Sequence, residues 1–338
     1  MKSLISIFCI IHLMVQINAQ NVITLDGTPG TRVFANIDSA LKYAVDGDDL
    51  YLHGGNISVP NGLNIKKRIH VFGAGHYPDS TIATGRTNIV GDVIFYNESS
   101  GSVLEGVYIT GDINFGTSST NAAAKNIRIS RCNVTNIQLS ENGSSFRGAE
   151  NVFIKDNVIR GEMRFAYVKN VVFETNCMVG QLQYADGITY IRNNIFMRGN
   201  NYTLSNVKYC RFENNIFLIS SQFLNGDCPG NLFYNNVFKE GDPLAGQYSS
   251  NNLFNVANLF VSQAGMVFSY FQDYHLTNDS PARNAGMGGT DCGIYGGANP
   301  YKEGALPVNP HIRSSVLPAQ TDTLGKLNIQ VKVAAQNN

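Results

Sequence analysis

Four charged side chains alternate in sign along the chain at a nearly constant spacing. Lys155, Glu174, Arg192 and Glu213 follow one another about every 20 residues. If each lies on one coil of a stacked backbone, Glu174 and Glu213 are two rungs, or about 9.6 Å, apart. Inverting glycoside hydrolases place two carboxylates about 6.5–9.5 Å apart. Arg192 would lie between the two glutamates and pair with both, whereas a general acid needs a raised pKa. We therefore favour a structural charge ladder and keep catalysis by Glu174, Arg192 and Glu213 as the alternative.

A second group of polar residues alternates with apolar ones. Glu162 and Arg164 share this pattern with Gln138 on one side and with Gln181 and Gln183 on the other. Period-two alternation predicts strands with one wet face. Amide and guanidinium groups suit hydrogen bonding to hydroxyl groups, so these five residues are our candidate ligand-binding set. The same pattern also fits an ordinary solvated sheet face, and that reading stays open.

Composition disfavours several classes of function. The formal net charge is zero and charged residues make up 15% of the chain, against about 25% in typical domains. The chain has no basic patch for nucleic acid. Its histidines are scattered, with no spacing for a metal site or a catalytic triad, and no dinucleotide or phosphate-loop motif is present. We therefore expect no metal and no cofactor.

The elements that position these residues belong to a repeat. An asparagine recurs about every 20 residues after an alternating apolar stretch, and two large apolar residues usually follow it. Strand-like units at this period predict a solenoid that buries its core by stacking coils. We interpret the asparagines as corner residues near the left-handed region whose side-chain amides stack in a ladder. They are Asn133, Asn157, Asn176, Asn194, Asn215 and Asn236, with Asn258 continuing the series.

Each coil has a predicted inside and outside. The residues three and five before each asparagine are mostly apolar, as in Ile154 and Val152, and are predicted to face the core. The residue after it, such as Val158 or Cys177, is also predicted to turn into the core, and Tyr184 is placed inward with Leu182. The outward column four residues before the asparagine is partly apolar. It comprises Phe153, Val172, Tyr190, Arg211 and Leu232.

The repeat and both of its ends resemble the right-handed parallel β-helix family, the pectin-lyase-like superfold. Residues 37–44 have apolar positions at helical spacing, and residues 47–52, 62–67 and 69–75 look like the cap helix and first coils of that family. Residues 273–297 resemble the terminating segment of secreted bacterial β-helix proteins. The resemblance implies an all-β, single-stranded right-handed parallel β-helix of roughly ten coils. It implies little about activity, because the family includes lyases, hydrolases and adhesins. In its lyases an arginine can serve as the base, which makes Arg164, together with Glu162, a conditional catalytic candidate.

The ends of the chain carry different signals. Residues 1–19 read as a signal peptide, with Lys2 before an apolar run and Ala19 at the cleavage point. We expect an N-terminal strand and cap helix over 20–48, the β-helix over 49–300, and a proline-containing linker with a C-terminal strand over 301–338. We further expect the tail to cover the apolar column of Phe153 and its neighbours.

The cysteines do not form a disulfide pattern. An odd number at irregular spacing remains after the leader. Cys177 and Cys210 fall at positions predicted to face the core, and the state of Cys228 and Cys292 is left open.

The predicted signal peptide indicates export and the resemblance implies a bacterial source, so we expect a protein secreted from a bacterium or held at its surface. It is predicted to be non-catalytic and to present a polar sheet face to an extracellular or cell-wall polysaccharide. The alternatives are a polysaccharide lyase or glycoside hydrolase, and a structural spacer.

Overall fold

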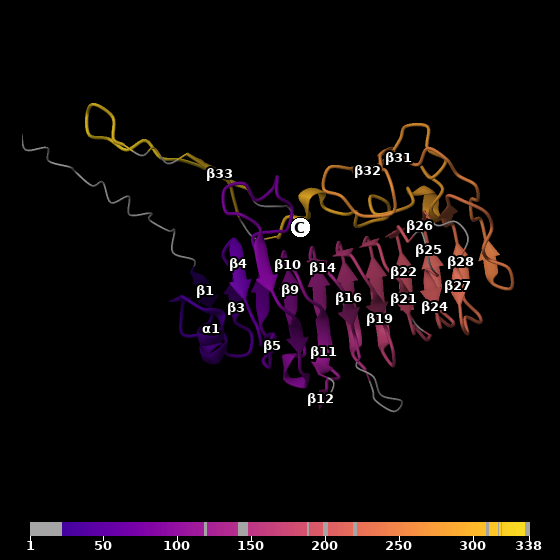
Figure 1. Ribbon diagram of the computed structural model, residues 1–338, viewed down its shortest axis with the longest axis horizontal. Helices are drawn as coiled ribbons and strands as arrows, with labels where there is room; N and C mark the ends of the chain where they lie inside the picture. Colours follow the sequence, from indigo (N-terminus) through magenta and orange to yellow (C-terminus); the bar gives the residue numbers. More distant parts are fainter. Residues whose placement is uncertain are drawn as a thin grey trace, which may run out of the picture.

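The protein is a parallel β-solenoid of about eight turns (Figure 1). The computed structural model describes residues 22–334 apart from 118–119, 141–147, 188, 199–201, 219–221, 309–310, 317 and 319. The predicted leader over 1–19 lies outside the described residues. The architecture confirms the predicted stack of parallel coils and is consistent with a right-handed β-helix. The turns are fewer than ten because one early coil carries a long loop and the chain leaves the stack after β30 (Tyr248–Ser250).

Three sheets run the length of the rod, and their strands pair in parallel except at the N-terminal cap and between β11 and β12. Sheet A contains, in spatial order, β2 (Arg32–Phe34), β1 (Ile23–Asp26), β3 (Asp49–Tyr51), β6 (His70–Phe72), β9 (Val103–Glu105), β13 (Arg128–Ser130), β16 (Glu150–Lys155), β19 (Lys169–Glu174), β22 (Thr189–Arg192), β25 (Arg211–Glu213), β28 (Leu232–Tyr234) and β30. Sheet B contains β4 (Gly55–Ser58), β7 (Thr87–Val90), β10 (Tyr108–Ile109), β14 (Asn133–Val134), β17 (Val158–Ile159), β20 (Cys177–Met178), β23 (Ile195–Phe196), β26 (Ile216–Phe217) and β29 (Val237–Phe238). Sheet C contains β5 (Leu63–Ile65), β8 (Val93–Phe95), β11 (Ile113–Thr117), β15 (Ile137–Gln138), β18 (Met163–Arg164), β21 (Leu182–Gln183), β24 (Leu204–Ser205) and β27 (Leu224–Asn225), with β12 (Thr120–Asn121) beside β11.

A short helix closes the N-terminal end of the stack. Helix α1 (Ile37–Tyr43) begins at Asn36, whose side chain accepts a hydrogen bond from the backbone N–H of Ser39 at 2.8 Å. Ile37 and Ala40 are its buried residues. The helix covers apolar side chains that the first coil would otherwise expose, as the sequence pattern predicts.

The core of the rod is formed by the predicted inward columns. Ile154, Phe173, Ile191, Phe212 and Phe233 are all fully buried, and aromatic rings stack between coils. The ring centroids of Phe212 and Phe233 are 4.6 Å apart, which is close to the strand spacing of a sheet. Stacking in register therefore continues from the backbone into the side chains.

The buried asparagines lie at the corner between sheets A and B. Both the backbone N–H and Nδ2 of Asn194 donate to Oδ1 of Asn215, at 3.0 and 2.9 Å, and Nδ2 of Asn194 also donates to the carbonyl oxygen of Phe173 at 3.0 Å. The same pattern joins each asparagine to the next one. The ladder consists of Asn157, Asn176, Asn194, Asn215, Asn236 and Asn252.

Two details of the asparagine prediction are wrong. The left-handed residue is the one before each ladder asparagine, for example Asn193 (φ 54°) or Asn214 (φ 55°). Asn133 is also not part of the ladder: on that coil the equivalent position is Cys132, whose backbone N–H donates to Asn157 Oδ1 at 2.9 Å. At the other end the ladder closes at Asn252 rather than at Asn258. The repeated asparagine is therefore selected for its buried amide rather than for its backbone conformation.

The paired apolar residues after each ladder asparagine face opposite sides of sheet B. Ile159, Met178, Phe196, Phe217 and Phe238 enter the main core. Val158, Cys177, Ile195, Ile216 and Val237 point outward, contrary to the prediction, and are buried in a second cluster. Strand alternation requires two neighbouring residues to face opposite sides, so both can be buried only if something covers the sheet from outside.

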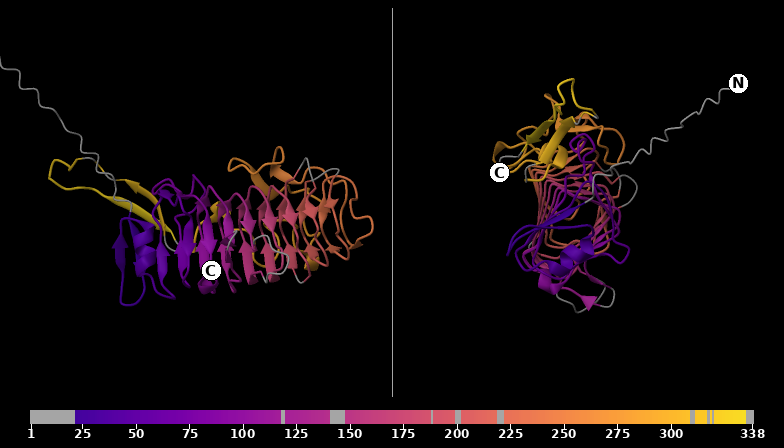
Figure 2. Two further views of the ribbon diagram at one scale, coloured as in Figure 1. Left: turned by 60° about the horizontal axis from the view of Figure 1, so that its bottom comes forward. Right: turned by 90° about the vertical axis from the view of Figure 1, so that its left-hand side faces the viewer.

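That cover is the segment 256–308, which we call the strap (Figures 1 and 2). It contains β31 (Phe260–Ser262), β32 (Asp273–Leu276) and two short 3-10 turns, Met287–Gly289 and Glu303–Ala305. Leu259, Leu276, Ile294 and Tyr301 pack on the outward residues of sheet B. The segment that resembles a β-helix terminus thus lies along the side of the rod, running back towards the first coils.

Polar residues at the corner hold the backbone of the strap. Nδ2 of Asn235 donates to the carbonyl oxygen of Ala285 at 2.9 Å, and Oδ1 of Asn214 accepts from the N–H of Met287 at 2.8 Å. Further along, the N–H of Val308 donates to Oε1 of Glu105 at 2.9 Å. From Ala285 to Val308, successive strap residues therefore contact coils that come earlier and earlier in the sequence.

The tail beyond the strap differs from the prediction. Instead of one strand lying on sheet A, the tail forms an antiparallel pair of β33 (His311–Val316) and β34 (Gln330–Ala334) at the N-terminal end of the rod. Phe153 and Tyr190 on sheet A are each 46% exposed, and Val333 in the tail is 58% exposed. The strap carries the tail away from that column, so the prediction that it covers Phe153 and Tyr190 is wrong.

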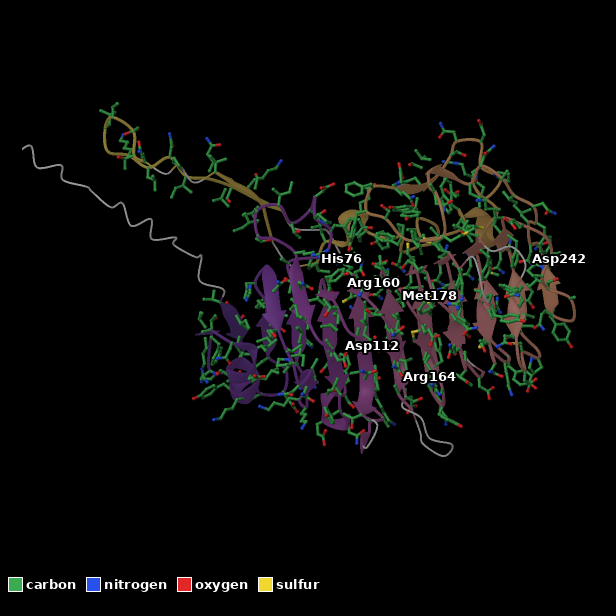
Figure 3. The ribbon with its side chains drawn as sticks, in the orientation of Figure 1. His76, Asp112, Arg160, Arg164, Met178 and Asp242 are labelled. Carbon is green, nitrogen blue, oxygen red and sulfur yellow. The ribbon has the colours of Figure 1, made fainter. Side chains whose placement is uncertain are left out.

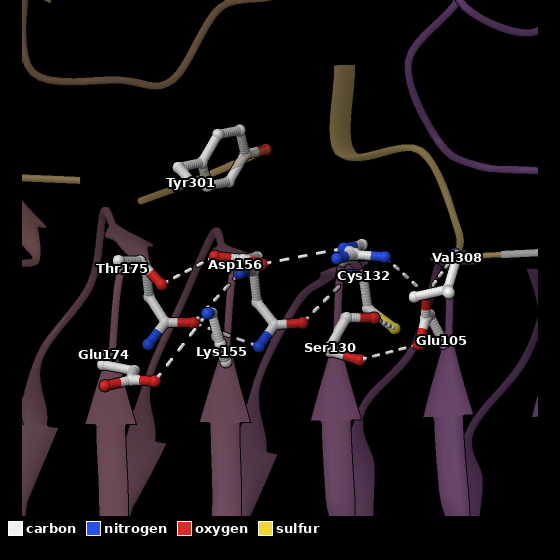
Figure 4. A network of polar contacts seen from close by, with 12 residues as sticks. Glu105, Ser130, Cys132, Lys155, Asp156, Glu174, Thr175, Tyr301 and Val308 are labelled. Atoms are coloured by element: carbon white, nitrogen blue, oxygen red, sulfur yellow. Dashed lines mark hydrogen bonds and ion pairs between the residues drawn. The ribbon is translucent and has the colours of Figure 1, made fainter. Parts of the chain in front are cut away.

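A buried polar network lies under the strap at the corner (Figure 4). Arg131 Nη1 lies 2.9 Å from Glu105 Oε1, and its Nε is 3.7 Å from Asp156 Oδ2. The hydroxyl of Thr175 donates to Asp156 Oδ1 at 2.6 Å. Burial raises the pKa of Asp156 to about 6, although Thr175, Lys155 and Arg131 act in the opposite direction. The charged form of this carboxylate is therefore a cost to the folded state above that pH.

We expect Asn215→Ala to destabilise the fold strongly. The change leaves buried groups on Asn194 and the carbonyl oxygen of Ile191 without partners, and each such group costs about 1–3 kcal/mol. Asn252→Ala, at the half-buried end of the ladder, is the matched control and should cost much less. Denaturant midpoints would measure both variants. Equal losses would contradict a ladder whose stabilisation comes from burial.

We expect Asp156→Asn to remove a pH-dependent cost. An unfolded aspartate has a pKa of about 3.9, and the folded value is higher, so wild-type stability should fall as pH rises from about 4 to about 6 and then level off. The gain of the variant should be absent below pH 4 and reach at most about 3 kcal/mol above pH 6. Thermal unfolding across this range would measure it, with the exposed Asp227→Asn as control. A gain that is the same at pH 3.5 and pH 7 would contradict the assignment.

Candidate functional site

The outer face of sheet C brings together the polar residues predicted to bind a ligand. Gln138, Arg164 and Gln183 lie on neighbouring strands and are in direct register. Strands in a sheet are about 4.8 Å apart, so these side chains form one evenly spaced column. All three are half-buried between their neighbours, as expected on a flat sheet face.

Glu162 and Gln181 lie at the corner that leads into this face. The N–H of Glu162 donates to Asn136 Oδ1 at 2.6 Å, and its side chain is exposed. Oε1 of Gln181 accepts a hydrogen bond from Nε2 of Gln183 at 2.7 Å. The five predicted residues are therefore close together, with the glutamate at the edge and the amides and Arg164 on the face.

Arg164 is the charged group at the centre of the column. Its Cζ lies 4.7 Å from the ring centroid of Tyr184, a geometry in which a cation is attracted to the ring face. Its Nε is buried and has no hydrogen-bond partner in the described structure. Within the described residues Arg164 also forms no ion pair, so its charge is available to a ligand.

Tyr184 was predicted to face the core, and that prediction is wrong. The residue adopts a left-handed conformation (φ 56°) after β21 and is 41% exposed. Tyr202 is 36% exposed, whereas Phe223 is buried. The turn interrupts the period-two alternation just before Tyr184, which is why alternation alone placed it on the wrong side.

The column has further members that the sequence pattern did not reveal. Asn114 precedes Gln138 in register, and Ser205 and Asn225 follow Gln183. Nδ2 of Asn225 donates to the Ser205 hydroxyl at 3.2 Å. A signal was present in the alternation of Ile113-Asn114-Phe115. It was hidden because the loops that lead to sheet C differ in length from coil to coil.

The charged column lies on sheet A, away from this face. Glu174, Arg192 and Glu213 are in register on successive strands, as predicted. Arg192 Nη2 lies 2.8 Å from Glu174 Oε2, and Lys155 Nζ is 3.9 Å from its other oxygen. Glu213 pairs with Arg211 of its own strand rather than with Arg192. Each carboxylate therefore lies against a cation, an arrangement that favours a structural ladder over an acid–base pair.

The cysteines contribute no reactive group to this face. The five described cysteines are buried and unpaired. Cys210 and Cys228 belong to the main core, and Cys177 and Cys292 to the cluster under the strap. Burial raises the pKa of Cys210 and of Cys292 to about 12, so these thiols stay protonated at physiological pH.

Comparisons with protein families and with curated proteins identify no relative. No protein-family model matches the chain, and no curated protein matches its sequence.

Across the residues that the structure describes, no set of three or more histidine, cysteine or acidic side chains is arranged to hold a metal ion. The described part of the chain contains no helix that is both long enough and apolar enough to span a bilayer.

Proposed function

We propose that this protein is exported and binds a glycan along the outer face of sheet C without cleaving it. The observation that carries the proposal is the in-register column of amides with the Arg164–Tyr184 pair at its centre. Amides both donate and accept hydrogen bonds, which suits the hydroxyl groups of a sugar chain. An exposed tyrosine ring provides an apolar surface with a polar edge beside them.

The even spacing of the column favours an extended ligand. Each coil repeats the same polar position, so the face offers similar contacts at regular intervals from Asn114 to Asn225. A polymer such as an extracellular or cell-wall polysaccharide can use many of these contacts at once. The avidity of such binding comes from the number of weak contacts rather than from one deep pocket.

The chemistry of the face favours binding over turnover. Glycoside hydrolysis requires two carboxylates on opposite sides of the scissile bond. Among the candidate ligand-binding residues, Glu162 is the carboxylate, and the carboxylates of the sheet A ladder are held in ion pairs. The alternative, a lyase or hydrolase that uses Arg164 and Glu162, makes a different prediction about products. A spacer would bind nothing on this face.

We expect Arg164→Ala and Gln183→Ala to weaken polysaccharide binding. A hydrogen bond to a charged group contributes about 1.5–3 kcal/mol, so loss of Arg164 should weaken binding about tenfold or more. Gln183→Ala should have a smaller effect. Arg128→Ala is the matched control, because this exposed arginine lies on sheet A. Affinity electrophoresis against acidic and neutral polysaccharides would measure all three variants.

The same polysaccharide panel distinguishes the alternatives. New unsaturated or reducing ends that disappear in Arg164→Ala would show an enzyme and overturn the proposal. Binding that Arg128→Ala and Arg164→Ala weaken equally would place the ligand elsewhere. No binding by the folded protein to any member of the panel would favour a spacer.

A further inference from the structure

A second site lies where the strap meets the outer face of sheet B. A cavity of about 280 Å³ opens between the strap and the early coils, slightly below the range of about 300–1,000 Å³ typical of small-molecule sites. Arg86, Tyr108, Asn133 and Arg160 line it from the solenoid, and Phe268 and Tyr270 line it from the strap. We call it the strap pocket. Figure 3 shows Arg160 on the side of the rod that carries the strap, whereas Arg164 lies away from it.

Two guanidinium groups meet over one tyrosine in this pocket. The Cζ atoms of Arg86 and Arg160 lie 4.2 and 4.5 Å from the ring centroid of Tyr108. Arg86 directly precedes β7, Arg160 directly follows β17, and Tyr108 on β10 lies between them in the sheet. The two cations therefore approach the ring from coils on either side of it.

No carboxylate of the described chain pairs with these two arginines. Elsewhere on the rod Arg131, Arg192 and Arg211 each contact an acidic side chain. Burial lowers the pKa of Arg160, and Arg86 lowers it further, whereas Tyr108, Tyr270 and Asp112 act in the opposite direction. The Asp112 carboxylate does not reach the guanidinium, and its Oδ1 accepts a hydrogen bond from Asn136 at 2.8 Å. The pocket thus concentrates positive charge that the described protein does not neutralise.

Hydrogen bonds hold the guanidinium of Arg160 in place, whereas the N–H donors of the Arg86 guanidinium have no acceptor among the described residues. Nη2 of Arg160 donates to the carbonyl oxygen of Ile109 at 2.8 Å and to the Thr135 hydroxyl at 2.7 Å, and its Nη1 donates to Asn133. The Arg86 backbone carbonyl accepts a hydrogen bond from the N–H of Gly55, but its guanidinium makes no hydrogen bond to another described residue. A guanidinium has five N–H donors in a planar fork that matches an oxyanion. Arg86 is therefore the group best placed to bind one directly.

The polar groups around the two arginines are uncharged. The Tyr270 hydroxyl accepts a hydrogen bond from Asn133 Nδ2 at 2.6 Å and lies 3.1 Å from Nδ1 of His76. His76 is fully buried, and its Nε2 has no partner in the described structure. Burial, together with Arg86 and Arg160, lowers the pKa of His76 to about 3, so the ring is neutral at physiological pH. The positive charge here is supplied by the two arginines alone.

We propose that the strap pocket binds the oxyanion of a small ligand, a carboxylate, sulfate or phosphate group, between Arg86 and Arg160. A negative group would relieve the repulsion between the two cations in a half-buried site, where charges interact more strongly than in water. Asn133 and Tyr270 would contact the polar part of the ligand, and Phe268 its apolar part. The alternative is a structural brace in which the arginines only hold the strap against Tyr108. This inference does not rest on glycan binding by sheet C.

The test measures binding of sulfate, inorganic phosphate and glucuronate by calorimetry and thermal unfolding. Ionic strength is matched with sodium chloride, because sulfate and phosphate also stabilise proteins without specific binding. We expect a saturable rise in the melting temperature for at least one of the three anions. A response to sulfate or phosphate would identify a tetrahedral group, and a response to glucuronate alone would identify a sugar carboxylate.

Arg86→Gln separates binding from bracing, since Arg86 makes no hydrogen bond that its loss would break. We expect this variant to bind the anion at least tenfold more weakly and, without the anion, to melt at or above the wild-type temperature. Arg128→Gln on sheet A is the matched control and should bind like wild type. Two results would overturn the proposal. One is the absence of saturable stabilisation by any of the three anions, and the other is unchanged affinity in Arg86→Gln.

Discussion

The corner between sheets A and B is where the chain must turn sharply inside the buried core. A strand that turns there loses sheet partners for its peptide groups, and a buried group without a partner is costly. The amide of each ladder asparagine supplies both a donor and an acceptor, and it finds them on the coils before and after it. This requirement fixes the register of every coil from Asn157 to Asn252. The columns on all three faces follow from that register.

The strap follows from the same constraint. After each corner, the strand of sheet B begins with two neighbouring apolar residues, as in β17. Neighbouring residues of a strand face opposite sides, so one of the two must point outward. A row of exposed valine, isoleucine and cysteine side chains would attract other chains. The strap buries this row, and the left-handed residues beside the ladder, Asn193, Asn214 and Asn235, hold its backbone. One short stretch of sequence per coil therefore supplies the inner corner, the core and the docking site of the strap.

The sequence allowed the core-facing columns to be predicted, but it concealed the cover of sheet B and the strap pocket. Ile154, Phe173 and their equivalents were placed inward because alternation within one strand is a local property. Val158 and Cys177 were misplaced because the residues that cover them lie in the strap, far away along the chain. The sequence showed no pattern that links Arg86 to Arg160, because a loop of unusual length interrupts the repeat between the early coils. Phe268 and Tyr270 reach these arginines only because the strap folds back over sheet B. Local alternation thus predicts faces, whereas pockets depend on contacts between distant segments.

The two candidate sites differ in a way that the architecture explains. Sheet C repeats one polar position on every coil, so a ligand can shift by one rung and find similar partners, and contacts add up along its length. The strap pocket occurs at one level of the rod, because it needs Tyr108, the two arginines and the Phe268–Tyr270 loop together. A small charged group bound there would meet fixed partners and could not shift. A stack of near-identical coils by itself provides only the first kind of site, and a non-repeating segment laid across the stack is what makes the second kind possible.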